Sequence, residues 1–319
     1  MAHKAKVGGT GYGVTGGKTK VGGTNYKVSK GKARISGTNY NISFVDEVLN
    51  NNDWATIRMV SDAGEAANYW SVGDTKSIVI NGTISAAATD YATTPVFSNL
   101  AINVFVLGFD HNSDKEGTNR IHFQIGKIGT TDIALCGTDY KQSNSSSYLY
   151  SFRMKDSGGN SGGWKGSTAR TILGNNSTPT NPTAGTVLAA LPSDLRAVMK
   201  SVTKYTDNKG GVDDNMSKSA VTATTDYLFL LSQYEIFKST SYSNPYEDDY
   251  QMQYDYYAAG NSKVKYQSFS TSTTCKWWTR SLYTTSTTAT SYCIVNESGS
   301  ATSISRLGSS FGYVPAFCV

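Results

Sequence analysis

The first 44 residues contain a 14-residue repeat that constrains the fold more than any other part of the sequence. The segment Lys6–Tyr12 returns as Lys20–Tyr26 and again as Arg34–Tyr40. One position held by valine or isoleucine recurs every seven residues, and glycine is dense. Because glycine disfavours helix and a coiled coil needs two apolar positions per heptad, the repeat predicts very short strands joined by tight turns. Such strands bury little surface, so we expect residues 1–44 to pack against copies of themselves or another protein.

A tryptophan-rich strand is predicted near the end of the chain. Trp277 and Trp278 are adjacent, so in a strand they point to opposite faces and anchor two packing layers. Arg280 shares a face with Trp278 and can stack on it or meet a buried carboxylate. We expect these three residues, with Trp164, to be structural anchors.

Four motifs in the second half of the chain resemble, in order, an uncharacterised domain family that is common in phages and in genomes of gut Firmicutes. They are Gly162–Ser167 with Arg170, Asp226–Ser232 with Glu235, Trp277–Ser281, and Pro315–Phe317. The family is in turn similar to the C-type-lectin-like and sulfatase-modifying-factor folds of phage adhesins, which end in a similar tryptophan-strand hairpin.

This resemblance implies an α+β fold. Gly-rich short-strand β repeats over residues 1–44 would precede a C-type-lectin-like mixed domain with long loops over residues 45–319. We divide that domain into a β-rich first half, residues 45–155, and a motif-bearing second half, residues 156–319.

Local patterns place the main elements of the domain. Apolar spacing predicts a helix over Trp54–Ala67, and Pro192 starts a second helix whose buried face extends to Val202. Asn81-Gly82 predicts a hairpin turn after a strand that begins at Ser77. The continuous apolar run in Asp226–Ser232 predicts a buried strand.

The composition is typical of a loop-rich extracellular or virion protein. Only 17% of residues are charged. The net charge of +5 is local, because residues 1–45 hold eight of the 29 basic residues and no acid, which leaves 21 basic residues against 24 acids. For this basic arm we favour a solvated face over nucleic-acid binding. The chain has no apolar run long enough to span a membrane and begins with no apolar signal segment, so we expect neither membrane insertion nor a secretory signal.

Residues suited to catalysis or metal binding are sparse. The chain has three histidines, one of them His3 in the tail, and its four cysteines include no C-x-x-C pair. The final hairpin would bring Cys275, Cys293 and Cys318 close together, and we expect buried free thiols for all four cysteines. We therefore expect no enzyme activity and no cofactor. The polar loop 110–117 offers weak calcium candidates, but we favour a plain hairpin loop over a metal site; these candidates are Asp110, Asn112 and Asp114.

Two segments beside the tryptophan strand have the composition of a recognition surface. Ser239–Thr273 and Tyr283–Ser310 are rich in tyrosine, serine and threonine and lack core periodicity. Tyrosine supplies large amphipathic contact area, and hydroxyl side chains supply adaptable hydrogen bonds. We predict that six tyrosines form an outward ligand-binding surface: Tyr250, Tyr254, Tyr256, Tyr257, Tyr283 and Tyr292.

These observations favour a phage virion protein of the tail tip or fibre, assembled in the bacterial host cytoplasm. Residues 1–44 would attach it to other virion proteins, and the C-terminal loops would bind a host-surface glycan or protein. We expect a homo-oligomer such as a trimer. The alternative is a capsid or tail decoration protein of the head-fibre type, which is structural and has no specific ligand.

Overall fold

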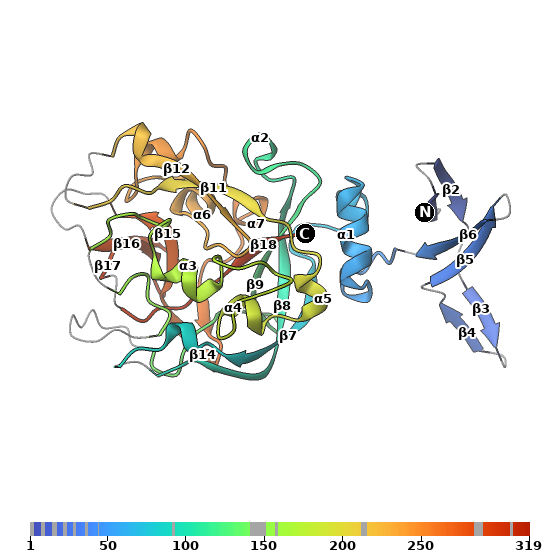
Figure 1. Ribbon diagram of the computed structural model, residues 1–319, viewed down its shortest axis with the longest axis horizontal. Helices are drawn as coiled ribbons and strands as arrows, with labels where there is room; N and C mark the ends of the chain where they lie inside the picture. Colours follow the sequence, from blue (N-terminus) through green and yellow to red (C-terminus); the bar gives the residue numbers. More distant parts are fainter. Residues whose placement is uncertain are drawn as a thin grey trace.

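The computed structural model describes six short strands between His3 and Ser43, and most of the chain after them. The described part of the body comprises residues 45–90, 93–140, 151–156, 159–211, 216–283, 290–306 and 309–319. Figure 1 shows the N-terminal strands at one end of the molecule, beyond helix α1 (Trp54–Asp62), with the body on the other side of that helix.

The N-terminal strands pair as three antiparallel hairpins, one for each copy of the repeat. Their innermost pairs are Val7 with Thr10, Val21 with Thr24, and Ile35 with Thr38, which are equivalent positions of the repeat. The bounds are β1 (His3–Val7), β2 (Thr10–Val14), β3 (Lys18–Val21), β4 (Thr24–Lys27), β5 (Lys30–Ile35) and β6 (Thr38–Ser43).

A seven-stranded mixed sheet forms the first layer of the body. Its order is β14-β13-β10-β9-β8-β7, and β18 pairs with β9 beside this path. The C-terminal strand β18 therefore pairs with a strand in the middle of the sheet. The bounds are β7 (Thr75–Thr83), β8 (Val96–Phe109), β9 (Ile121–Ile128), β10 (Thr131–Ala134), β13 (Lys265–Gln267), β14 (Ser270–Cys275) and β18 (Ala316–Cys318).

Two smaller sheets complete the body. A two-stranded sheet pairs β11 (Val202–Asp207) with β12 (Val221–Asp226), and a three-stranded sheet has the order β15-β16-β17. The latter contains the predicted tryptophan strand, and its bounds are β15 (Trp277–Leu282), β16 (Ser291–Val295) and β17 (Ala301–Arg306).

The helices are short. After α1, the α-helices are α2 (Ser113–Glu116), α3 (Thr168–Leu173), α4 (Val187–Ala190), α5 (Ser193–Arg196), α6 (Gln233–Phe237) and α7 (Asp255–Ala258). The 3-10 turns are η1 (Leu49–Asn51), η2 (Ala66–Asn68), η3 (Ser85–Ala87), η4 (Lys218–Ala220) and η5 (Pro245–Glu247). Among the described residues, no helix has the length and apolar character needed to cross a membrane.

The predicted α+β, lectin-like fold class is wrong. The protein is mostly β, with 33% strand and 21% helix, and its largest unit is a mixed sheet of several strands. The helical periodicities mark segments that stop after one or two turns. The segment from Pro192 leaves the helix after Arg196, because Val202 already pairs with Asp226 in the β11–β12 sheet.

Three local predictions also fail. Asn81-Gly82 makes no turn, because β7 continues to Thr83; the irregularity there is a bulge in β8, where Ser98 and Asn99 lie opposite Asn81. The run Asp226–Ser232 is buried apart from Tyr227, but after Asp226, which ends β12, it pairs only through a bridge from Phe229 to Ala316. The long loop expected over Ser239–Thr273 instead contains η5, α7, β13 and most of β14.

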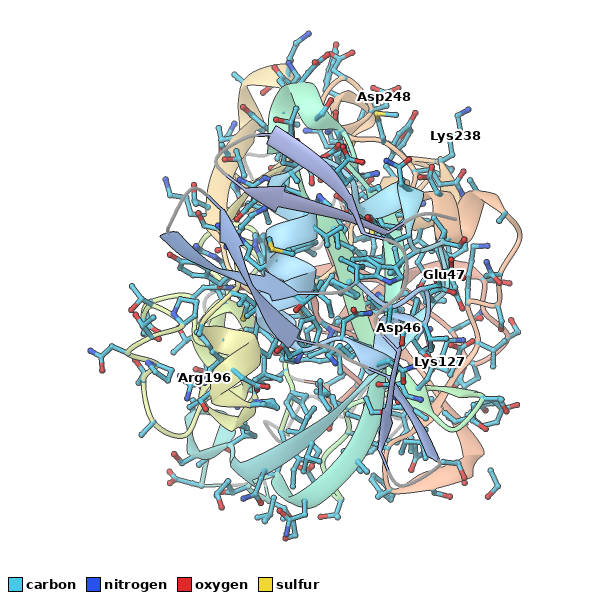
Figure 2. All side chains as sticks on the ribbon, turned by 90° about the vertical axis from the view of Figure 1, so that its right-hand side faces the viewer. Asp46, Glu47, Lys127, Arg196, Lys238 and Asp248 are labelled. Carbon is cyan, nitrogen blue, oxygen red and sulfur yellow. The ribbon has the colours of Figure 1, made fainter. Side chains whose placement is uncertain are left out.

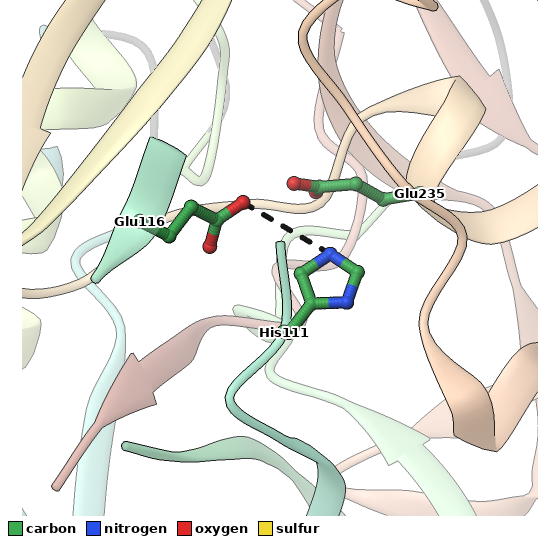
Figure 3. A group of neighbouring side chains, drawn as sticks. All are labelled: His111, Glu116 and Glu235. Atoms are coloured by element: carbon green, nitrogen blue, oxygen red, sulfur yellow. Dashed lines mark ion pairs between the residues drawn. The ribbon is translucent and has the colours of Figure 1, made fainter. Parts of the chain in front are cut away.

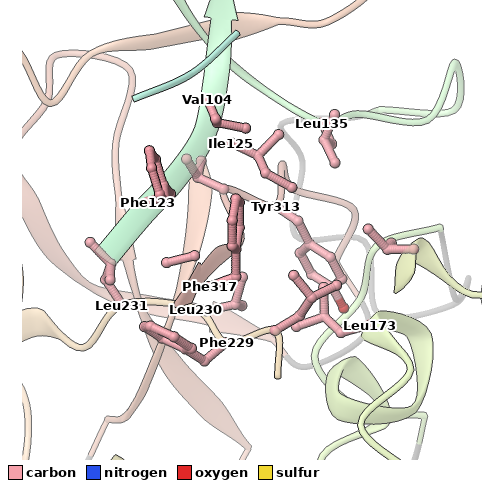
Figure 4. Packing of buried hydrophobic residues seen from close by; sticks show 14 of the residues in the cluster. Val104, Phe123, Ile125, Leu135, Leu173, Phe229, Leu230, Leu231, Tyr313 and Phe317 are labelled. Atoms are coloured by element: carbon pink, nitrogen blue, oxygen red, sulfur yellow. The ribbon is translucent and has the colours of Figure 1, made fainter. Parts of the chain in front are cut away.

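Tryptophans connect the layers of the core. Trp277 and Trp278 are fully buried, and their indole N–H groups donate to the carbonyls of Lys263 and Phe152 at 3.0 and 2.8 Å. Trp164 is equally buried and donates to Asp226 Oδ2 at 2.9 Å. Figure 4 shows how side chains from β9, β18 and the segment before α6 meet in this core; among them are Phe123, Phe317, Phe229, Leu230 and Leu231.

Candidate functional site

The predicted tyrosine surface does not exist. Tyr254, Tyr256, Tyr257 and Tyr292 are at most 3% exposed, while Tyr250 and Tyr283 are half-buried. Each of the innermost hydroxyls has an internal partner. The Tyr257 hydroxyl donates to Gln124 Oε1 at 2.7 Å, and the Tyr292 hydroxyl donates to the carbonyl of Gly163 at 3.1 Å.

The physical reason for this error is the amphipathic nature of tyrosine. A ring can fill a core while its hydroxyl satisfies a buried polar group, so a segment without aliphatic periodicity can still be core. Residue composition alone does not distinguish this arrangement from a recognition loop.

A buried ionic network occupies the centre of the body and is the most unusual arrangement of side chains there. Arg280 on β15 holds the Glu235 carboxylate on α6, with Nη2 at 2.9 Å from Oε1. Lys204 Nζ on β11 lies 3.0 Å from Glu235 Oε1 and 2.6 Å from Glu116 Oε2 on α2. All four side chains are almost fully buried, so two cations and two carboxylates neutralise each other away from solvent.

Local backbone features fix Glu235 for this role. Ser232 caps α6 by accepting the N–H of Glu235 at 3.0 Å, and Glu235 Oε2 accepts the N–H of Ser232 at 2.9 Å. This reciprocal capping box fixes the direction of the carboxylate. Arg280 also donates to Thr206 Oγ1 at 2.7 Å and to the carbonyl of Leu230 at 2.9 Å, so the guanidinium is held on several sides.

Two histidines and a tyrosine line the other side of the network. His111 stacks on the Tyr254 ring with centroids 3.7 Å apart, and His122 Nδ1 lies 3.0 Å from the Tyr254 hydroxyl. That hydroxyl accepts from Lys204 Nζ at 2.8 Å. Burial, aided by the positive charge of Lys204, lowers the pKa of His111 to about 3 and the pKa of His122 well below its ordinary value. Both imidazoles are therefore neutral near pH 7.

The two carboxylates of the network differ in their protonation. Burial raises the pKa of Glu116 to about 7, although Lys204 opposes this shift. Burial also disfavours ionisation of Glu235, but Arg280 and Lys204 outweigh it and hold the pKa of Glu235 well below its ordinary value. Glu235 is thus the permanent anion of the network.

The network includes a set of groups that could ligate a metal. Potential ligand atoms of His111, Glu116 and Glu235 lie within 4.8 Å of one another, and Figure 3 shows the three side chains converging. This donor set would suit zinc or manganese. However, the Lys204 ammonium contacts both carboxylates and Arg280 contacts one of them, so a divalent ion would meet two cations. We conclude that Lys204 takes the place that a metal would need.

The weak calcium candidates in the 110–117 loop have other roles. Asp110 Oδ1 accepts the N–H of Arg120 at 2.9 Å, and the Asn112 amide donates to the carbonyl of Tyr250 at 2.8 Å. The residues after Asn112 form α2, which begins at Ser113 and so includes Asp114. The sequence predicted a plain hairpin loop here. It did not predict this helix, which positions Glu116 in the network.

Another buried carboxylate, which is not a member of the network, lies close to it. Glu247 is fully buried; its Oε1 accepts the N–H of Asp207 at 3.1 Å, and its Oε2 accepts from the Ser281 hydroxyl at 2.8 Å. Burial raises its pKa to about 7, against the effect of these hydrogen bonds.

The four cysteines are buried and carry free thiols. The predicted grouping of Cys275, Cys293 and Cys318 is wrong, because the neighbouring pair is Cys136 and Cys275, with sulfurs 3.9 Å apart. Cys318 instead lies beside His122, at 3.4 Å from Nδ1. Burial raises the pKa of Cys136 and Cys293 well above the ordinary value and that of Cys318 to about 12, so these thiols are poor nucleophiles.

A surface pocket of about 320 Å³ lies at the far end of β8 from the network. Three segments line it: the first residues of β8, the chain after β10, and the β13–β14 turn. The lining residues are Val96, Phe97, Ser98, Asn99, Leu100, Ala101, Cys136, Gly137, Thr138, Ser268 and Phe269. Unlike the ionic network, this pocket is accessible from solvent, since Val96 and Phe269 are 61% and 50% exposed.

Comparison with known families finds one match. The model of a domain of unknown function, DUF6273, matches residues 138–319. The chain belongs to the DUF6273 family. No curated protein matches the chain, and no solved structure does.

The ionic network crosses the boundary of the DUF6273 segment. Arg280, Glu235 and Lys204 lie within residues 138–319, whereas Glu116 and both body histidines precede them. Without Glu116, the members of the network that lie in the DUF6273 segment would be two buried cations, Lys204 and Arg280, and one permanent anion, Glu235. The connection between β8 and β9, which precedes the DUF6273 segment and contains α2, therefore completes the charge balance of the network.

Part of this network was visible in the sequence. Of the two alternatives for Arg280, stacking on Trp278 or meeting a buried carboxylate, the contacts with Glu235 show the second. Lys204 was missed, although it stands at a position between Val202 and Thr206 where alternation along a strand points inward. Glu116, His111 and His122 carried no local signal that distinguishes them from loop and strand residues.

The role of Lys204 can be tested by exchanging it for a neutral side chain of similar length. Lys204→Met leaves Glu116 and Glu235 without their shared cation, so we expect a loss of about 3–5 kcal/mol in unfolding free energy. It also clears the position between the carboxylates, so zinc chloride should raise the melting temperature of the variant and not of the wild type. Lys209→Met, at an exposed position, is the control and should behave as wild type in both respects. Zinc stabilisation of the wild-type protein would contradict the assignment.

Glu247 predicts a pH dependence of stability. Its pKa is about 7 in the folded protein against 4.5 ordinarily, so its protonation stabilises the fold fully below pH 4.5, and this contribution is lost as the pH rises through 7. Glu247→Gln mimics the protonated form at every pH. The stability of the variant relative to wild type should therefore rise between pH 5 and pH 8, by on the order of 2 kcal/mol, in urea unfolding curves. A stability difference between variant and wild type that stays constant from pH 5 to pH 8 would show that Glu247 is ionised in the folded protein throughout this range.

Proposed function

We propose that the chain is an attachment protein of a multimeric particle, such as the tail tip or fibre of a phage virion. In this proposal the three N-terminal hairpins join it to the assembly. The body presents a surface that binds a glycan or protein on a host cell.

The single observation that carries the proposal is the division between the hairpin repeat and the body. Each hairpin has only two strands, and the three share one register. Isolated two-stranded hairpins are at best marginally stable in water, so such a repeat gains order by pairing or packing with further chains. The body, in contrast, has an extensive hydrophobic core among its own described residues, from Val45 to Val319.

The residue types along the hairpin register support an assembly role. Pairs that contain valine, isoleucine or tyrosine, such as Ala5–Tyr12 and Ala33–Tyr40, alternate with pairs that contain a cation, such as Lys6–Gly11 and Arg34–Asn39. Adjacent positions of a strand belong to opposite faces of the ribbon. A repeat with one apolar and one basic set of positions is suited to stacking with copies of itself.

The chemistry of the body supports binding rather than catalysis. Its most strongly perturbed carboxyl and imidazole groups, such as those of Glu235 and His111, lie in the interior, where Glu235 pairs with Arg280. Charged side chains such as Arg196, Lys238 and Asp248 lie around the outside (Figure 2). An enzyme needs its reactive groups within reach of a substrate, and the network offers no such access.

One observation favours the second candidate, a decoration protein without a specific ligand. The burial of Tyr254, Tyr256, Tyr257 and Tyr292 removes most of the predicted recognition surface. If the body binds no host surface, its function is to add a rigid unit to the particle.

Deletion of residues 1–44 tests the attachment role. In sedimentation experiments we expect the full chain to form a defined oligomer and the truncated chain to be a folded monomer, because the body has its own core. Adsorption to a panel of Firmicute cells separates the two candidates: binding by the full chain supports the attachment protein, and absence of binding supports decoration. A full-length chain that stays monomeric at all concentrations, or a truncated chain that still forms the same oligomer, would overturn the assembly role of the hairpins.

A further inference from the structure

We propose that the pocket between the start of β8 and the β13–β14 turn binds a neutral saccharide. This inference rests on the proposed function, since it names the ligand class and the place where the body would contact a host surface. It replaces the buried tyrosines as the recognition site.

The lining of the pocket excludes a charged ligand as its natural occupant. None of its residues is an acid, a lysine, an arginine or a histidine. A carboxylate or phosphate ligand would be left without a counter-charge, which is costly in a recessed site. The pocket volume of about 320 Å³ lies at the small end of ligand sites, which suits one or two sugar rings.

The remaining side chains match the two kinds of group on a sugar ring, its apolar C–H groups and its hydroxyls. Phe269 and Val96 both line the pocket and are half exposed or more, and exposed apolar side chains that lie together mark a binding site where single ones do not. The Phe269 ring offers a flat apolar surface for the C–H groups of a pyranose, as aromatic rings do for other apolar faces. Ser98, Asn99 and Thr138 are exposed around it and supply hydroxyl and amide groups for the sugar hydroxyls.

The backbone of β8 adds further hydrogen-bonding groups. β8 pairs with β9 only from Asn103 onward, and in the described part of the chain no strand pairs with Val96–Ile102 on the side away from β7. The pocket is lined by most of this unpaired stretch. Backbone N–H and C=O groups are thus available beside the exposed side chains.

An unpaired strand edge can also bind an extended peptide, but the local geometry disfavours this occupant. Ser98 and Asn99 form a bulge opposite Asn81, and Asn99 adopts a left-handed φ of 50°. A bulge interrupts the regular ladder that an added strand requires. A compact polyol needs no such ladder, so we favour the saccharide.

The test compares the full chain with two variants that keep the fold. Phe269→Ala removes the stacking surface at a half-exposed position. Asn99→Gly removes the amide while allowing the same left-handed backbone. Tyr246→Ala, at an aromatic residue of η5 that is 43% exposed, is the matched control. Binding is measured by saturation-transfer NMR and on an array of neutral and acidic glycans, with melting temperatures recorded for every variant.

We expect the wild type and Tyr246→Ala to bind at least one neutral saccharide, and Phe269→Ala to weaken that binding by about tenfold or more at an unchanged melting temperature. Asn99→Gly should weaken it less. The proposal is overturned if the wild type binds no neutral saccharide, if only acidic glycans or extended peptides bind, or if Phe269→Ala binds as the wild type does. If cells adsorb the wild type and Phe269→Ala equally, the pocket is wrong while the proposed function stands; if cells adsorb neither, the proposed function fails.

Discussion

The ion pair between Arg280 and Glu235, extended by Lys204 to Glu116, is the interaction on which the rest of the body depends. The four side chains come from β15, α6, β11 and α2, which are far apart in the sequence. Each charge is buried, so none is tolerable unless its partners are in place. This requirement couples the formation of elements that share few other contacts, and it explains why short helices and small sheets form one body.

This coupling gives the DUF6273 segment a dependence on the part of the chain that precedes it. Residues 138–319 contribute three members of the network, and the chain from the end of β8 to β9 contributes Glu116 and the neutral His111 and His122. The C-terminal strand β18 adds a second connection by pairing with β9. With the interior committed to this structural role, the binding that we propose falls to the β8 pocket and the N-terminal hairpins.

The sequence predicted the parts of the structure that depend on local pattern. The 14-residue repeat marked the hairpin strands, and adjacent tryptophans marked a strand of the core. The fold class, the tyrosine surface and the cysteine grouping depended on packing between distant segments and were wrong. Tyr254 illustrates the reason. Its segment has the composition of a loop, yet its hydroxyl accepts a hydrogen bond from the buried Lys204 ammonium. Lys204 could be predicted only from its inward position in β11. No local sequence pattern marks Glu116 as a member of the network.

We infer that the network couples the residues before 138 and the DUF6273 segment into one cooperative unit. Native-state hydrogen exchange of the full chain measures this directly, by comparing the opening free energies of amides in β9 with those in β11 and β15. If the unit is cooperative, the slowest amides of all three strands exchange with the same opening free energy, which equals the free energy of global unfolding. Two separate values, one for residues before 138 and a different one for residues after it, would contradict it.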